Sequence, residues 1–158
     1  MPDVFAGREI VEISVQIEKN GMDYYNALIK KTKNMKAKEV FKYLAGEEEK
    51  HIIIFKNILD ALEKYEPQEV VTDEYFAYMN ALASEHVFTI KNKGLDMAGK
   101  TKSDKEAIRL GIGFEKDSII FYEGMKNVVP ERDKKTVDAV IEQEKTHLRK
   151  LSEIKSGL

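Results

Sequence analysis

Apolar residues recur three and four positions apart along most of this chain, which is the spacing of a helix that buries one face. Four long stretches show the pattern. The first covers about residues 4–33 and the second about residues 36–65. The third begins at residues 103–106, a Ser-Asp-Lys-Glu capping box, and the fourth places Pro130 in its first turn. The short connection between the first two stretches predicts that they are antiparallel neighbours.

Residues 66–102 break this rhythm and connect the second long helix to the third. Thr72, followed by two acidic residues, has the character of an N-cap before an acidic first turn. Residues 75–91 keep helical spacing, whereas residues 92–102 are rich in Gly and Lys and indicate a loop. We therefore predict an all-α fold, an antiparallel four-helix bundle. A long crossover with one or two short helices joins its second and third helices.

Six polar residues interrupt the apolar faces of these helices, and their positions repeat. Each half of the chain has one Glu in its first long helix and a Glu-x-x-His step in its second. On a helix this step puts carboxylate and imidazole on neighbouring turns of one face. A shift of 97 residues superimposes the single Glu positions, and a shift of 96 superimposes the two steps. The six residues are Glu18, Glu48, His51, Glu115, Glu144 and His147.

These six side chains predict a site for two metal ions. Burying one unpaired carboxylate is costly, and four that repel one another cannot all stay ionised in an apolar core. No Lys or Arg lies on the same faces near them. Two divalent cations would balance the four carboxylates, with the two neutral imidazoles as further ligands. Mixed oxygen and nitrogen ligands suit iron or manganese, and zinc is a further candidate.

Parts of this pattern also have plainer interpretations. A lone Glu-x-x-His step arises by chance in Glu-rich helices, and only the repetition makes metal binding the better hypothesis. Tyr25 and Tyr122 each follow a single Glu by seven residues. They fit core aromatics and side chains that hold a ligand carboxylate equally well. Glu47 and Glu49 flank the apolar face and are expected in solvent. His86 has no counterpart in the repeat, which favours an ordinary surface or interface histidine.

Composition restricts the function further. With a net charge of −2, the chain lacks the basic surface that nucleic-acid binding requires. No apolar run approaches the length of a membrane span, and no signal peptide is visible. Because there is no cysteine, disulfides, iron–sulfur clusters and thiolate zinc sites are excluded. We expect one cytoplasmic domain over residues 1–158 that binds neither nucleic acid nor membrane.

The six residues and their spacing resemble the ferritin-like di-iron carboxylate superfamily, and within it the erythrin domain of rubrerythrins. The resemblance covers nearly the whole chain and implies a ferritin-like bundle with two iron ions. Glu48 and Glu144 would then bridge the two ions. Glu18 and Glu115 would be terminal ligands, and each of the two histidines would bind one ion. Tyr25 falls where rubrerythrins keep a tyrosine of the site, so it and its repeat partner are candidate catalytic residues.

Two departures from the family bear on activity. Rubrerythrins carry a rubredoxin module whose four cysteines hold the metal that feeds electrons to the iron pair. This chain has no cysteine, so a separate donor protein must supply the electrons. Rubrerythrins also have a second Glu on the third long helix, three residues from the first. Here the two flanking positions are Ile112 and Ser118. The departure weakens the peroxidase assignment and leaves the metal site untouched.

The sequence thus predicts a di-iron oxidoreductase that reduces peroxide or oxygen with electrons from an external donor. One alternative is a ferritin-like protein that oxidises or binds iron with little turnover, and another is a purely structural metal site. The crossover has more large apolar residues than a peripheral connector needs, which predicts packing against a second copy in a homodimer. These residues are Tyr75, Phe76, Tyr78, Met79, Phe88 and Ile90.

Overall fold

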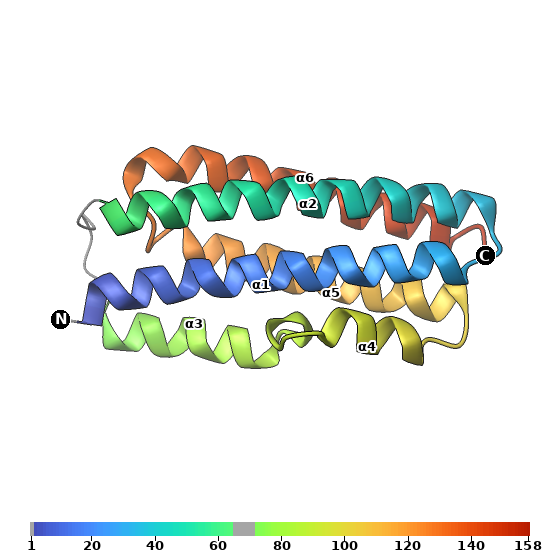
Figure 1. The fold of residues 1–158 in the computed structure, drawn as a ribbon, viewed down its shortest axis with the longest axis horizontal. Helices are drawn as coiled ribbons and strands as arrows, with labels where there is room; N and C mark the ends of the chain where they lie inside the picture. The colour runs from blue at the N-terminus through green and yellow to red at the C-terminus, as the bar shows by residue number, and fades with distance from the viewer. Residues whose placement is uncertain (1, 65–71) are drawn as a thin grey trace.

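The computed structural model describes residues 2–64 and 72–158, and within these ranges it contains helices and no strand. Its four longest helices are α1 (Pro2–Lys31), α2 (Met35–Lys64), α5 (Asp104–Met125) and α6 (Lys134–Lys155). They lie side by side along the long axis of the molecule (Figure 1). Contacts of α1 with α2 and of α5 with α6 form two pairs, and α1–α5 and α2–α6 contacts join them. The predicted all-α fold class, a ferritin-like helical bundle, is confirmed.

In each of these four contacts the two long helices run in opposite directions, so neighbouring long helices are antiparallel (Figure 1). The N-terminal capping of α5 is as predicted, because the Ser103 hydroxyl accepts a hydrogen bond from Glu106 N at 3.1 Å. Pro130, in contrast, does not lie in the first turn of the last long helix. Its backbone is extended, with φ −58° and ψ 152°, and it precedes the 3-10 turn η2 (Glu131–Asp133). No helix in the described ranges combines the length and apolar character needed to cross a membrane.

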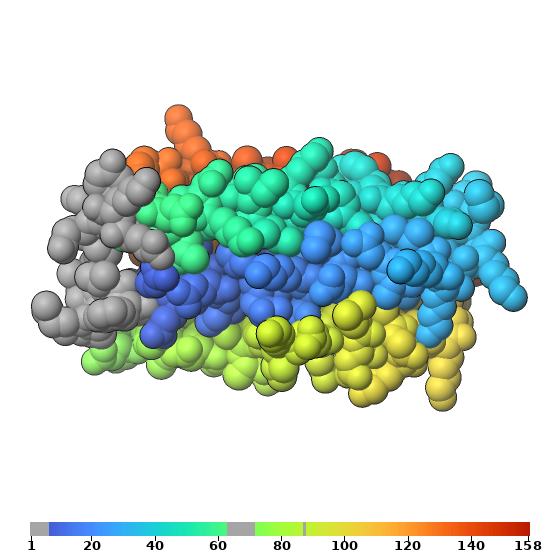
Figure 2. Space-filling model, viewed as in Figure 1, coloured from blue at the N-terminus to red at the C-terminus, as the bar shows by residue number. Residues whose placement is uncertain are grey.

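The segment between α2 and α5 runs along one side of the bundle. It contains α3 (Asp73–Glu85), the 3-10 turn η1 (Val87–Thr89) and α4 (Lys93–Lys100). The predicted N-cap of α3 is present, since the Thr72 hydroxyl accepts a hydrogen bond from Tyr75 N at 3.1 Å. α3 packs mainly on α5, whereas η1 and α4 pack on α1, and Figure 2 shows the segment lying closely along α1. α2 and α6 therefore form the side of the bundle that faces away from the crossover (Figure 1).

The loop predicted for residues 92–102 is wrong, because most of this stretch forms α4. Asn92 precedes the helix with a left-handed backbone, φ 65°. Gly94 lies against the backbone of α1, where an added Cβ would be 2.0 Å from the carbonyl oxygen of Asn20. The Asn20 side chain donates two hydrogen bonds to crossover carbonyls and accepts one from Gly94 N. Gly94 thus serves close packing of a helix on α1, and only the tertiary contact reveals this.

The apolar residues of the crossover are partly buried within their own chain. Met79 and Phe88 are buried, Tyr78 and Ile90 are exposed, and the Tyr75 hydroxyl donates to a backbone carbonyl of α5. The bundle itself therefore covers much of the apolar surface from which a homodimer was expected, and the dimer stays a prediction.

Candidate metal centre

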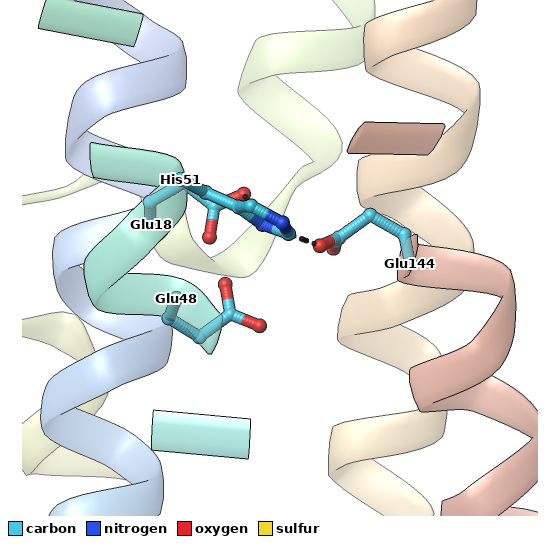
Figure 3. A group of neighbouring side chains, drawn as sticks. All are labelled: Glu18, Glu48, His51 and Glu144. Carbon is cyan, nitrogen blue, oxygen red and sulfur yellow. Dashed lines mark ion pairs between the residues drawn. The ribbon is translucent and has the colours of Figure 1, made fainter. Parts of the chain in front are cut away.

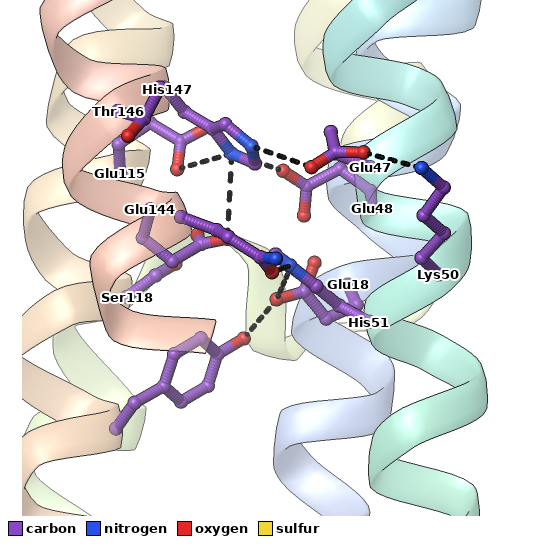
Figure 4. A network of polar contacts seen from close by, with 12 residues as sticks. Glu18, Glu47, Glu48, Lys50, His51, Glu115, Ser118, Glu144, Thr146 and His147 are labelled. Carbon is purple, nitrogen blue, oxygen red and sulfur yellow. Dashed lines mark hydrogen bonds and ion pairs between the residues drawn. The ribbon is translucent and has the colours of Figure 1, made fainter. Parts of the chain in front are cut away.

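The four long helices bring the six predicted ligands together in the middle of the bundle (Figures 3 and 4). Glu18 comes from α1, Glu48 and His51 from α2, Glu115 from α5, and Glu144 and His147 from α6. All six have 0% of their surface exposed. Because residues three apart lie on one face of a helix, α2 and α6 each present a carboxylate and an imidazole to the same interior point.

The ligand atoms of these residues form two overlapping groups. Within each group, one nitrogen or oxygen atom of every residue lies within 4.8 Å of the others. One group is Glu18, Glu48, His51 and Glu144, and the other is Glu48, Glu115, Glu144 and His147. Glu48 and Glu144 belong to both groups. The geometry thus offers two adjoining positions for metal ions that share two carboxylates.

Both imidazoles turn Nδ1 towards these carboxylates. His51 Nδ1 lies 2.9 Å from Glu144 Oε1 (Figure 3) and 3.4 Å from Glu18 Oε1. His147 Nδ1 lies 3.4 Å from Glu48 Oε1 and 3.5 Å from an oxygen of Glu144 (Figure 4). The two rings stack at a centroid distance of 5.7 Å with 20° between their planes. Nδ1 is therefore the nitrogen that each histidine offers to a metal ion.

Most polar atoms of the cluster have no hydrogen-bond partner. Among the described residues, ten buried side-chain nitrogen or oxygen atoms are unpartnered, and nine of them belong to the six candidate ligands. Both oxygens of Glu48 and both of Glu144 are included. An unsatisfied buried polar group costs roughly 1–3 kcal/mol, so native proteins keep few of them. Eight of these nine atoms, all except the outer nitrogen Nε2 of His147, come from carboxylates or from the inner imidazole nitrogens and fit a pair of metal ions.

The electrostatics of the cluster favour bound protons or cations. Burial, together with the charges of Glu115 and Glu18, raises the pKa of Glu144 well above its ordinary value. Burial alone would lower the pKa of His51 and of His147, but the neighbouring carboxylates outweigh it and both pKa values are raised. A metal ion that enters this cluster therefore competes with protons for the atoms of these three residues.

Each tyrosine predicted at the site is hydrogen-bonded to a Glu from the other half of the chain. The Tyr25 hydroxyl donates to Glu115 Oε1 at 2.8 Å. The Tyr122 hydroxyl donates to Glu18 Oε1 at 2.7 Å. Burial and the nearby carboxylates raise the pKa of both tyrosines well above the ordinary value, so both hydroxyls keep their protons as donors. Each Glu retains one unpartnered oxygen, which leaves that oxygen for a metal ion. A catalytic role of the tyrosines stays a prediction.

His86 is not the surface or interface residue that the sequence suggested. Only 3% of its surface is exposed, and its Nε2 lies 3.0 Å from the Ser118 hydroxyl. Its Nδ1 accepts a hydrogen bond from Phe88 N, so the ring proton lies on Nε2. Burial lowers the pKa of His86 to about 4, and the ring is neutral at pH 7. The prediction failed because the segment around η1 folds onto α5 beside Ser118, a contact that the repeat in the sequence does not mark.

Two residues outside the predicted set lie against the outer nitrogens of the histidines. Gln143 Oε1 is 2.6 Å from His51 Nε2. Glu47 Oε1 is 3.9 Å from His147 Nε2, and only 12% of the Glu47 side chain is exposed. The expectation that Glu47 lies in solvent is therefore wrong, whereas Glu49 is exposed as expected. A signal was present in the sequence, because Glu47 and Gln143 immediately precede the Glu of the two repeated steps.

The family model described as Rubrerythrin matches residues 9–155, a span that includes all six candidate ligands and both tyrosines. Comparison with curated proteins and with solved structures gives no significant match. The matched span is nearly the whole chain, and it agrees with the helical bundle and its buried Glu and His cluster. The chain belongs to the rubrerythrin family.

Proposed function

We propose that this protein is a di-iron oxidoreductase that reduces peroxide or oxygen with electrons from a separate donor protein. The observation that carries the proposal is the pair of adjoining ligand groups, fully buried and largely unpartnered, which share Glu48 and Glu144. Membership of the rubrerythrin family supports iron as the metal. Iron supplies the redox chemistry when bound, by cycling between its ferrous and ferric states.

The residues divide into roles by their place in the two groups. Glu48 and Glu144, which belong to both ligand groups, would bridge the two metal ions. Glu18 with His51 would complete one position, and Glu115 with His147 would complete the other. Four carboxylates balance the charge of two divalent ions, and the imidazoles are neutral ligands. This balance removes the charge repulsion that would otherwise destabilise the core.

The remaining contacts position these ligands and limit the access of water. Tyr25 and Tyr122 each hold one oxygen of a terminal Glu, so that its other oxygen is free for the metal. On the crossover side, η1 and the buried His86–Ser118 hydrogen bond close the region beside Glu115. These 158 residues contain no cysteine to hold an iron–sulfur or rubredoxin-type centre, which supports a separate electron donor.

A protein that oxidises or binds iron with little turnover is the second candidate. It is favoured by the absence of a further carboxylate three residues to either side of Glu115. Ile112 is partly buried at one of these positions, and Ser118 is engaged with His86 at the other. The metal site then lacks the additional ligand that would support repeated cycles.

The test is metal analysis followed by anaerobic turnover, on protein produced in iron-rich medium. The proposal expects two irons per chain and a near-ultraviolet absorption that appears when the ferrous protein meets peroxide. With a reductant present, peroxide should disappear over many equivalents per iron pair. One oxidation per site without further consumption would favour iron binding over catalysis. Fewer than two metal ions per chain, for iron, manganese and zinc alike, would contradict both.

A further inference from the structure

The two halves of the chain differ beside their repeated metal ligands. The residue that precedes the Glu of the Glu-x-x-His step is Glu47 on α2 and Gln143 on α6. Each of these side chains reaches the histidine of the other helix. Gln143 meets the outer nitrogen of His51. Glu47 faces the outer nitrogen of His147 (Figure 4). One histidine therefore has a neutral amide as its outer partner, and the other has a carboxylate.

A metal ion bound at Nδ1 fixes the ring proton on Nε2, and this proton needs an acceptor. For His51 the acceptor is in place, because Gln143 Oε1 lies at a hydrogen-bond distance of 2.6 Å. His147 Nε2 is buried and has no hydrogen-bond partner. Glu47 Oε1 lies 3.9 Å from it, and no closer carboxylate oxygen faces this nitrogen among the ion pairs of the described residues.

A second contact, an ion pair with Lys50, orients the Glu47 carboxylate relative to His147. Lys50 Nζ, on the same helix, lies 3.0 Å from Glu47 Oε2 and leaves Oε1 facing the imidazole (Figure 4). Most of the Glu47 side chain is shielded from water, whereas Lys50 is exposed. The arrangement therefore presents one carboxylate oxygen, Oε1, to the His147 ring while the other is paired with Lys50.

We propose that Glu47 and Gln143 are positioning residues that make the two metal positions unequal. The position that contains His147 binds its ion more tightly than the position that contains His51. A carboxylate that accepts the ring proton increases the electron density of an imidazole, and so strengthens its bond to the metal, more than an amide does. This inference rests on the proposed two-metal site and assigns an order of filling within it.

The experiment is a calorimetric titration of the metal-free protein with cobalt(II), followed in parallel by the visible absorption of bound cobalt. Repulsion between two ions separates the binding steps in any paired site, so two steps in the wild type do not decide the question. The responses of Glu47→Gln and Gln143→Glu do. Glu49→Gln is the matched control, because it removes the same charge from an exposed position on the same helix.

Loss of the carboxylate partner should weaken the tighter position. In Glu47→Gln the first binding step is expected to weaken by roughly tenfold, with the second step changing about twofold or less. In Gln143→Glu the second step should strengthen by a similar factor while the first changes little. The double exchange should restore the wild-type separation between the two steps. The cobalt absorption of the first step should also change in Glu47→Gln, which a general loss of stability would not cause.

Failure of the inference and failure of the proposed function give different results. If wild-type protein binds fewer than two cobalt ions per chain, the two-metal site itself is contradicted. If two ions bind and Glu47→Gln behaves like Glu49→Gln in both steps, the site stands and the role of Glu47 is overturned. An equal weakening of both steps in Glu47→Gln would likewise overturn it, because a bulk charge effect would then explain the result.

Discussion

The two helical pairs of this molecule, α1–α2 and α5–α6, are alike inside and unlike outside. Towards the bundle axis both present a Glu, a Glu-x-x-His step and a buried tyrosine. On the outer surface, the groove between α1 and α2 is lined by apolar residues and by charges of both signs. Its lining is Lys19, Met22, Asp23, Glu49, Ile52, Ile53 and Lys56.

The corresponding groove between α5 and α6 contains four basic residues and no acidic one. Its lining is Ile112, Lys116, Lys145, Leu148, Arg149, Ser152 and Lys155. Ile53 and Arg149, for example, occupy equivalent places in the repeat. The difference shows that the buried positions of the repeat are constrained more strongly than the solvated ones. A buried set of carboxylates must match in position and charge, whereas solvated positions tolerate almost any exchange.

The largest effect should come from breaking the likeness of the two halves at a shared carboxylate. Glu144→Ala removes a ligand of both metal positions, so both the second ion and redox activity should be lost. His51→Ala should mainly weaken one ion. Iron counts per chain after dialysis measure the difference, and Glu48→Ala should match Glu144→Ala. Two irons retained in the Glu144→Ala protein would show that this carboxylate is not shared.

The second effect concerns pH and distinguishes the metal-free from the metal-loaded protein. The folded-state pKa values of Glu144, His51 and His147 are raised. The folded protein therefore binds these protons more tightly than the unfolded chain, and the resulting stability is lost as pH rises through the folded pKa values. The ordinary pKa values are 4.5 for Glu and 6.5 for His. The stability is therefore lost at pH values above 4.5 for Glu144 and above 6.5 for the two histidines.

Calorimetry of metal-free protein should accordingly give a higher unfolding temperature near pH 5.5 than near pH 7. Protein loaded with zinc, chosen to avoid redox change, should show the opposite trend, because protons compete with the metal for the same atoms. Equal unfolding temperatures at both pH values in the metal-free protein would contradict the protonated cluster.

An intermediate effect is expected from the two tyrosines. It tests whether the repeated tyrosines contribute equally to the free energy of unfolding as well as occupying equivalent positions. Tyr25→Phe and Tyr122→Phe each leave a buried carboxylate oxygen without its donor. The free energy of unfolding should fall by roughly 1–3 kcal/mol in each case. Urea denaturation of the metal-free variants measures both values side by side. A large loss in one variant with none in the other would show that the halves are not equivalent.

The smallest effect should follow from making the outer grooves alike. Ile53 is 57% exposed, and Ile53→Arg gives α2 the residue found at the equivalent place on α6. The free energy of unfolding should change by no more than about 0.5 kcal/mol, and the metal count should not change. Thermal unfolding and metal analysis check both. A loss of metal in this variant would show that substitutions in the groove affect metal binding at the buried site.

The inner face of the bundle could be predicted from the sequence, because the ligands interrupt regular apolar spacing and do so twice. The apolar spacing places Glu18 and Glu115 on the buried faces of their helices, and the repetition makes them candidate ligands. The crossover could not be predicted as well, since it occurs once. Gly94 looked like a loop residue because its contact with α1 is invisible in the chain. Glu47 and Glu49 flank Glu48 on α2. Which of the two faces α6 depends on how α2 and α6 cross, and local spacing does not determine this.

The hydrogen bonds of Asn20 indicate the order in which the bundle and its site form during folding. Asn20 lies two residues beyond Glu18, yet its hydrogen-bond partners Phe88, Ile90 and Gly94 are 68 to 74 residues further along the chain. Contacts of such long range form late, because a large loop must close before they contribute. The two hairpins, by contrast, are built from neighbours in sequence. A chain still being synthesised therefore has a first hairpin with half of the ligands, and a metal ion finds its full set only after α6 has arrived.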